Sequence, residues 1–290
     1  MSIDLHIHSS FSDGSMSPTE LVQYAQRLHL TALSITDHDT IEGVGEAMTA
    51  GKQFGVEVIS GLELSIKFGD FAVHLLGYMF QPTDKGLLSA LHRLQVGRIE
   101  RNKAILDNLC RLGIDIADAE LQKKSGHGQC GRPHFAQLLM HKGIVGSMDE
   151  AFDKYLARGG LAYVPRTVFQ ADEAIAMVKN AGGIAVLAHP QQLEKSGNDV
   201  TVIIGKLRTI GLDGIEVYYP NHSRQFKKKL LAIARKQNLL ITGGSDYHGT
   251  IRPGTTLAGG SNCSVPPELL RQMKRYLEKK HGILESTQIG

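Results

Sequence analysis

The stretch IDLHIHSSFSDG, residues 3–14, points to both the fold class and the chemistry of this chain. Ile3 to Ile7 reads as a short strand, and histidines stand at its end, at positions 6 and 8. Side chains two residues apart in a strand face the same way, so His6 and His8 can both reach one ion. By itself an H-x-H pair is weak, because exposed or core histidines are common. It gains weight only from the rest of the chain.

Short apolar runs alternate with helical patterns along the chain, which is typical of βαβ units and a largely parallel sheet. Ser17 and Glu20 form a capping box that opens the first helix, with Pro18 at its first position. Further strands are predicted at 33–36, 56–59, 71–80, 184–188, 214–217 and 239–242, and further helices at 45–54, 172–181 and 224–237. We therefore expect an α/β fold.

The middle of the chain follows another pattern. Residues 85–163 are helical in pattern, basic and without clear strands. We interpret them as a mainly helical insertion into a body formed by residues 1–84 and 164–290.

Composition sets limits on the class of protein. In 290 residues, 42% are hydrophobic and 21% charged, as in a soluble globular enzyme, and the net charge of +3 does not itself indicate a nucleic-acid binder. Three scattered cysteines favour a reducing compartment over a disulfide framework. With no apolar run of membrane-spanning length, we expect a cytoplasmic protein that needs neither a membrane nor an obligate protein partner.

Histidines and carboxylates recur where the predicted strands end. In barrel enzymes such ends gather at one face and build the active site, so these side chains are expected to form one cluster. Imidazole and carboxylate without thiolate suit Mn²⁺, Zn²⁺ or Fe²⁺. Taken singly, the aspartates could instead cap a helix or a turn. The candidate ligands are His6, His8, Asp13, His38, Glu63 (after the third strand), His74 (within the fourth), His189, and Asp246 with His248 after the last strand.

Five motifs occur in order along the chain: DLHIHSSFSDG (4–14), ITDHDT (35–40), GLELS (61–65), AHP (188–190) and GSDYH (244–248). Together they resemble the PHP (polymerase and histidinol phosphatase) superfamily. The resemblance implies a distorted (β/α)7 TIM-like barrel with a helical insertion. Departures are mild: leucines at 62 and 64 replace the usual Val and Ile, Tyr247 replaces Phe, and Gln191-Gln192 follow His-Pro where Gly-Arg is common.

Within that superfamily, GRIERN (97–102), GRPHFA (131–136) and KYLARGGLAYV (154–164) resemble the stand-alone branch. That branch contains nucleoside 3′,5′-bisphosphate phosphatases and the 5′-to-3′ exoribonuclease RNase AM. The resemblance implies three ion sites, with Mn²⁺ expected and Zn²⁺ or Fe²⁺ possible. By it, His6, His8, Glu63 and Asp246 hold one ion, Asp13, His38 and His248 a second, and Glu63, His74 and His189 a third.

The insertion carries candidate substrate-binding residues. Arg98, Arg101 and Asn102 fall on one helix face, where two guanidiniums can grip a phosphate. Arg132 and His134 form a second cationic pair beside a proline. From the residues alone a solvated basic face, with Glu100 supplying ion pairs, is an equal alternative. The resemblance favours phosphate binding.

The expected activity is hydrolysis of nucleotide phosphates by a metal-bridging hydroxide. The expected substrates are nucleoside 3′,5′-bisphosphates such as pAp, which lose the 3′ phosphate, and short RNA degraded from its 5′ end. Asp39 and His222 are the candidates for protonating the leaving oxygen. Two alternatives stay open: a histidinol-phosphate type of small-molecule phosphatase, and a PHP module that binds without catalysis.

Overall fold

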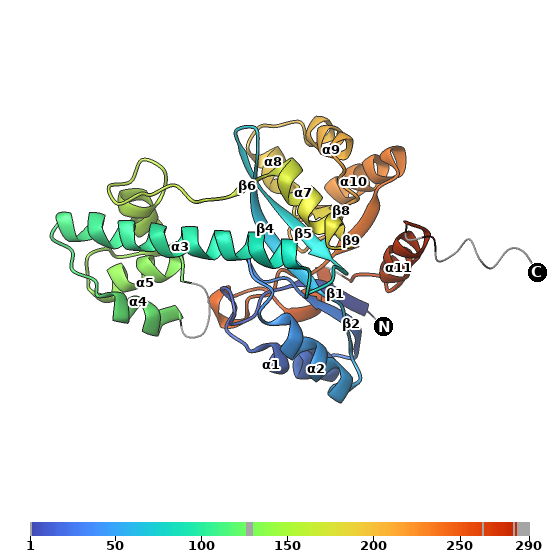
Figure 1. The fold of residues 1–290 in the computed structure, drawn as a ribbon, viewed down its shortest axis with the longest axis horizontal. Helices are drawn as coiled ribbons and strands as arrows, with labels where there is room; N and C mark the ends of the chain where they lie inside the picture. The colour runs from blue at the N-terminus through green and yellow to red at the C-terminus, as the bar shows by residue number, and fades with distance from the viewer. Residues whose placement is uncertain (1, 126–129, 263, 281, 283–290) are drawn as a thin grey trace, which may run out of the picture. The chain divides into compact units, whose positions relative to one another are not determined.

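A computed structural model of the chain describes residues 2–125, 130–262, 264–280 and 282 (Figure 1). The chain divides into two compact units, one formed by Met1–Leu88 with Phe169–Gly290 and the other by Ser89–Val168. The second unit begins and ends a few residues later than the insertion expected at 85–163. No helix among the described residues is long and apolar enough to cross a membrane.

The first unit contains two sheets. The smaller has three parallel strands, and the larger has six, in the order β6-β4-β5-β7-β8-β9. The bounds in the smaller sheet are β1 Ser2–Ile7, β2 Leu30–Ile35 and β3 Glu57–Val58. Those in the larger are β4 Gly61–Phe68, β5 Phe71–Tyr78, β6 Phe169–Gln170, β7 Ile184–Leu187, β8 Gly214–Tyr218 and β9 Leu240–Gly243.

The larger sheet is mixed, because β5 runs antiparallel to both β4 and β7. The prediction of a largely parallel sheet is thus wrong at these two pairings. Strand β4 was also missed, although apolar and polar residues alternate along GLELSIKF (61–68) as they do in a strand, and its first six residues are all buried. It pairs with β5 in continuous register from Gly61 opposite Tyr78 to Phe68 opposite Phe71, and Gly69-Asp70 form the two-residue turn.

The two sheets meet through isolated bridges at their strand ends. Ile7 pairs with Tyr247 and His38 pairs with Glu63, both in parallel orientation. Backbone bonds reinforce these junctions: Asp246 donates its N–H to the carbonyl of His6 at 2.8 Å, and Glu63 donates to that of Asp37 at 3.1 Å. Segments distant in sequence are thereby fixed side by side where the candidate ligands stand. Closure into a single barrel stays a prediction.

Helices flank the sheets of the first unit, and their sequences explain their limits. In α1 the Ser17 hydroxyl accepts the N–H of Glu20 while the Glu20 carboxylate accepts that of Ser17, so the predicted capping box is present, and α1 packs against α2. Figure 1 shows α1 and α2 beside β2, and α7 and α10 against the larger sheet. The bounds are α1 Pro18–Arg27, α2 Val44–Phe54, α7 Ala171–Asn180, α8 Gln191–Lys195, α9 Val200–Thr209, α10 Arg224–Gln237 and α11 Glu268–Lys280.

The described residues of the second unit form helices joined by irregular segments, without a strand, and have their own core. Phe135, Leu139, Ile105 and Leu109 are fully buried there. The helices are α3 Lys85–Arg111, which begins in the first unit, α4 Asp118–Ser125, α5 Arg132–His141 and α6 Met148–Ala151, followed by a π-helical turn at Phe152–Leu156.

Candidate metal centre

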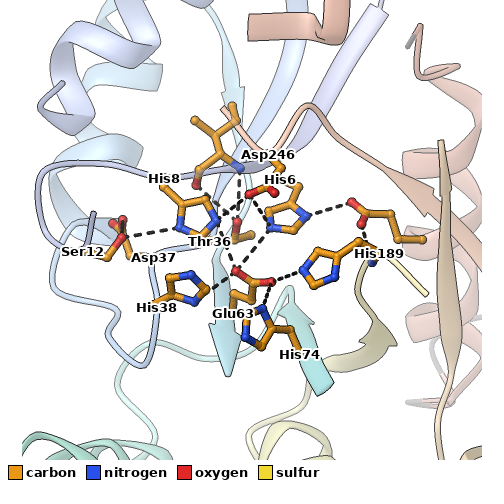
Figure 2. Close-up of polar contacts among 12 residues, drawn as sticks. His6, His8, Ser12, Thr36, Asp37, His38, Glu63, His74, His189 and Asp246 are labelled. Atoms are coloured by element: carbon orange, nitrogen blue, oxygen red, sulfur yellow. Dashed lines mark hydrogen bonds and ion pairs between the residues drawn. The ribbon is translucent and has the colours of Figure 1, made fainter. Parts of the chain in front are cut away.

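All nine candidate ligands of the first unit come together at one point. In Figure 2 the Glu63 carboxylate lies among histidine rings, with Asp246 close by; the histidines drawn are His6, His8, His38, His74 and His189. Glu63 follows the third strand, as predicted, but it lies within β4, a strand that was not predicted. The burial of that strand holds its carboxylate 1% exposed among the imidazoles.

Glu63 is the centre of the cluster, since five imidazoles surround its two carboxylate oxygens. Its Oε2 lies 3.4 Å from His6 Nε2, 3.2 Å from His8 Nε2 and 3.1 Å from His38 Nδ1. Its Oε1 lies 2.9 Å from both His74 Nδ1 and His189 Nε2. One carboxylate reaches both halves of the cluster, which is the geometry that a bridging ligand requires.

Two aspartates flank this centre on the His8 side. Asp246 Oδ1 lies 3.2 Å from His8 Nε2 and 3.5 Å from His6 Nε2. Asp13 Oδ1 lies 3.4 Å from His248 Nε2 and 3.5 Å from His8 Nδ1. Its Oδ2 lies 3.8 Å from His38 Nε2.

The route by which Asp246 and His248 reach the cluster differs from the expectation. They do not lie in a strand that points both side chains one way, because β9 ends at Gly243 and Asp246 has the left-handed φ of 54°. Such a conformation is uncommon for a residue with a side chain and concentrates at functional sites. His189 also has a positive φ, 25°, just after β7.

Four overlapping groups of side chains bring their ligand atoms within 4.8 Å of one another. The expected second set appears with His8 added to Asp13, His38 and His248. His74 and His189, expected to share an ion, fall in separate groups, although both contact Glu63 Oε1. The remaining groups are His6, Glu63, His189; His6, His8, Asp246; and His38, Glu63, His74.

The ring nitrogens and the ionised carboxylates of the cluster suit the binding of metal cations. The Nε2 atoms of His6, His8 and His248 and Nδ1 of His38 are buried and make no hydrogen bond to any described residue. Burial opposes charge on His8, yet Asp246, Glu63 and Asp13 raise its pKa to about 10. For Glu63, burial favours the neutral acid, but the surrounding histidines hold its pKa well below its usual range. Such carboxylates need positive charge beside them, which divalent ions supply.

A second layer of carboxylates orients the ligands. Glu216 Oε1 lies 2.9 Å from His6 Nδ1, and its Oε2 accepts the backbone N–H of His189 at 2.7 Å. Asp37 accepts hydrogen bonds from the N–H and hydroxyl of Ser9 and from Ser12, at 2.5 to 2.7 Å. The sequence reading did not find Glu216; a fully buried acid inside the apolar strand GIEVY was the available signal.

The two candidates for the general acid lie outside the four ligand groups. Asp39 accepts the backbone N–H of Ser65 at 3.0 Å, a contact that ties the β2 end to β4. His222 places Nδ1 2.9 Å from the carbonyl oxygen of Val217, so Nδ1 carries the proton, and burial lowers its pKa. Its Nε2 is then a proton acceptor, which argues against a role as proton donor.

In the second unit the predicted phosphate-binding residues are partly interior. Arg101 is 6% exposed and donates from Nε to the Val164 carbonyl at 3.0 Å, while Asn102 is 8% exposed and donates to the Cys130 carbonyl at 3.1 Å. Burial first, then the positive charges of Arg132, Arg166 and Arg98, lowers the pKa of Arg101 to about 10. Arg166 was not identified from sequence.

Arg132 and His134 open helix α5. Arg132 donates to the Leu156 carbonyl at 3.1 Å, and the Nδ1 of His134 accepts the Gly131 N–H at 3.1 Å. The second unit thus holds several cations near one another, an arrangement that favours an anion.

Comparison with known proteins agrees with this geometry. The model of the PHP domain matches residues 4–238. The chain belongs to the PHP family. It is 32% identical to a 3′,5′-nucleoside bisphosphate phosphatase of Chromobacterium violaceum, over 96% of this chain and 97% of the relative. It is 34% identical to a 5′-3′ exoribonuclease of Haemophilus influenzae, over 84% and 89% respectively.

A solved structure shares the fold. A protein of Bifidobacterium adolescentis assigned as a metal-dependent phosphoesterase superposes with a TM-score of 0.81 at 31% identity, covering 93% of this chain and 94% of that one. Family, relatives and ligand set together make this chain a metal-dependent phosphoesterase.

Proposed function

We propose that this PHP enzyme hydrolyses nucleotide phosphates, removing the 3′ phosphate of nucleoside 3′,5′-bisphosphates such as pAp and degrading short RNA from its 5′ end. One observation carries the proposal: a cluster of arginines accompanies a nine-residue set of metal-type ligands in the same chain. A phosphomonoester with one anionic group needs fewer cations than this. The relatives named above act on bisphosphates or RNA, which fits the same reading.

We infer that the ligand cluster holds up to three ions, with Mn²⁺ expected and Zn²⁺ or Fe²⁺ as possible occupants. Bound there, such ions would lower the pKa of water and neutralise charge on a phosphate. Glu63 is placed to bridge them, because its two oxygens contact different histidines. With this function we propose a distorted (β/α)7 barrel, in which the strand ends gather at one face.

The protein's own groups hold this centre rigid. Tyr219 donates its hydroxyl proton to Asp246 Oδ2 at 2.9 Å, and Arg252 contacts the same oxygen at 2.5 Å. Both contacts leave Oδ1 of Asp246 directed at His6 and His8. Glu216 faces Nδ1 of His6, so Nε2 is the ring nitrogen that would bind an ion.

We propose that Arg98, Arg101, Arg132 and His134, with Asn102, bind the phosphate that is not hydrolysed. Burial and then three neighbouring arginine charges lower the pKa of Arg101, and a bound anion would relieve the repulsion between these charges and Arg101. Arg132 is positioned by the Leu156 carbonyl, which leaves further N–H donors of its guanidinium for a phosphate.

The test compares pAp with adenosine 3′-phosphate, which lacks the 5′ phosphate. The wild type, purified anaerobically with its metal content measured, should turn over pAp with the higher kcat/KM. Arg132→Gln should remove most of that preference, about tenfold or more, through KM. Arg235→Gln, on the exposed side of α10, is the matched control and should keep the preference.

The same assays separate the alternatives. Preference for histidinol phosphate over pAp would favour the small-molecule phosphatase. Metal-loaded protein that binds RNA and cleaves neither substrate would favour a binding module. Glu63→Gln should lose both metal and activity; retention of both would overturn the metal assignment.

A further inference from the structure

A polar cavity of about 370 Å³ lies beside Asp246, within the first unit. Its walls come from the segment after β8, through Tyr219 and Asn221, and from the segment after β9, through Arg252, Thr255 and Thr256. These are the segments that follow two neighbouring parallel strands, so both open at the same edge of the sheet. None of the five motifs extends beyond residue 248, and most of the second wall follows that point.

The cavity is joined to the metal centre by shared side chains. Tyr219 and Arg252, which line it, are the two residues that contact Oδ2 of Asp246. Asp246 therefore has its Oδ1 in the ligand cluster and its Oδ2 against the cavity wall. A group bound in the cavity would lie directly next to a phosphate held at the cluster.

The lining has the chemistry of a site for an anionic, hydroxyl-rich group. Among the described residues that line the cavity none is acidic, while Arg252 supplies a cation and its side chain is 50% exposed. The Asn221 amide and the hydroxyls of Thr255 and Thr256 supply neutral donors and acceptors. The volume lies at the lower end of the roughly 300 to 1,000 Å³ typical of small-molecule sites, which suits one nucleotide unit.

We propose that this cavity binds the nucleotide on the 3′ side of the scissile phosphate of RNA. The inference rests on the proposed function. In both proposed substrates water attacks phosphorus, the P–O3′ bond of the first nucleotide breaks, and O3′ leaves with a proton. In pAp the phosphorus then departs as inorganic phosphate. In RNA it departs still attached through O5′ to the second nucleotide, and that unit needs a place to lie.

The cavity explains how one metal centre can hydrolyse both RNA and a mononucleotide. A bisphosphate leaves the cavity empty, so Asn221, Thr255 and Thr256 make no contact with it. An RNA places ribose and its next phosphate there, where Arg252 can neutralise the phosphate and the threonines can bond the ribose hydroxyl. The cavity thus determines chain length specificity, while the metal centre is common to both reactions.

The experiment uses the full metal-loaded chain and three substrates that break the same bond: pAp, its 3′-phosphate methyl ester, and the dinucleotide pApA. The blocking variants Asn221→Trp and Thr256→Phe replace exposed residues at the cavity. Thr49→Phe, exposed on α2, is the matched control. Metal content and the unfolding temperature are recorded for every variant.

The blocking variants should lower kcat/KM for pApA at least tenfold. They should leave pAp and the methyl ester within about twofold of wild type, because neither places a nucleotide in the cavity. An equal loss on all three substrates would overturn the inference, since the walls would then only support Asp246. Unchanged cleavage of pApA would overturn it as well. Wild-type protein that cleaves neither pAp nor pApA would instead refute the proposed function.

Discussion

The Nδ1 atom of His6 lies 2.9 Å from Oε1 of Glu216, and both side chains are fully buried. A carboxylate at that distance accepts a hydrogen bond from Nδ1–H, so Nε2 is the ring nitrogen that faces Glu63 and Asp246 and that a bound ion would use. The same carboxylate accepts the His189 N–H, so one residue orients two candidate ligands from different strands. Glu216 binds no ion itself in this arrangement and acts as a positioning residue.

Replacing Glu216 tests this role. Glu216→Gln keeps the size of the side chain but loses its charge, so metal affinity and kcat should fall by roughly 10- to 100-fold, as for other second-layer partners of metal-bound histidines. Metal content after dialysis against graded free Mn²⁺ measures the effect.

The matched control is Glu194→Gln, which removes an exposed ion pair with Lys229 and should behave as wild type. Normal metal affinity in Glu216→Gln would show that His6 needs no such partner.

The sequence predicted which side chains meet, because residues at the ends of successive strands gather at one face of the fold. It did not predict how they meet. Glu63 was expected after the third strand and not within a further one, although GLELSIKF (61–68) alternates apolar and polar residues. Asp246 was expected after the last strand, but nothing in GSDYH indicates that its backbone is left-handed. Glu216 and Arg252 act through contacts with residues 210 and 6 positions away, which no local pattern encodes.

Close backbone approach fixes the junction between β1 and the segment after β9. A Cβ atom on Gly244 would lie 2.3 Å from both the Cβ and the backbone nitrogen of His6. Gly244→Ala should therefore displace His6, lower the free energy of unfolding by about 1 to 3 kcal/mol and reduce metal content.

Gly45→Ala provides the contrast, because nothing lies within 4 Å of its added Cβ and it sits in α2. Alanine there should stabilise the protein by about 0.5 to 1 kcal/mol. Chemical denaturation of both variants checks the pair; similar stabilities would contradict the close approach at His6.

Metal ions should stabilise the folded chain, because the carboxylates Glu63, Asp13 and Asp246 are held among ring nitrogens that the unfolded chain does not assemble. At a free Mn²⁺ concentration of 100 times Kd, one bound ion adds about 2.7 kcal/mol to the free energy of unfolding. Thermal unfolding with and without chelator measures this, and Glu63→Gln should show a much smaller metal-dependent shift. A metal effect of equal size in both proteins would place the ion elsewhere.

His222 should make stability depend on pH. It is 4% exposed, and its burial lowers its pKa below the ordinary value of about 6.5. As pH falls below about 6.5, His222 becomes protonated in the unfolded chain but stays neutral in the folded chain. Protonation therefore favours the unfolded chain, and the free energy of unfolding decreases toward acid pH. His222→Gln can keep a bond to the Val217 carbonyl but cannot titrate. The gap in unfolding temperature between wild type and His222→Gln should therefore shrink from pH 7.5 to pH 5.5.

His92→Gln, at an exposed position of α3, should show a constant gap. A gap that stays constant or widens for His222→Gln would mean that His222 is charged in the folded protein, and would restore it as a candidate proton donor.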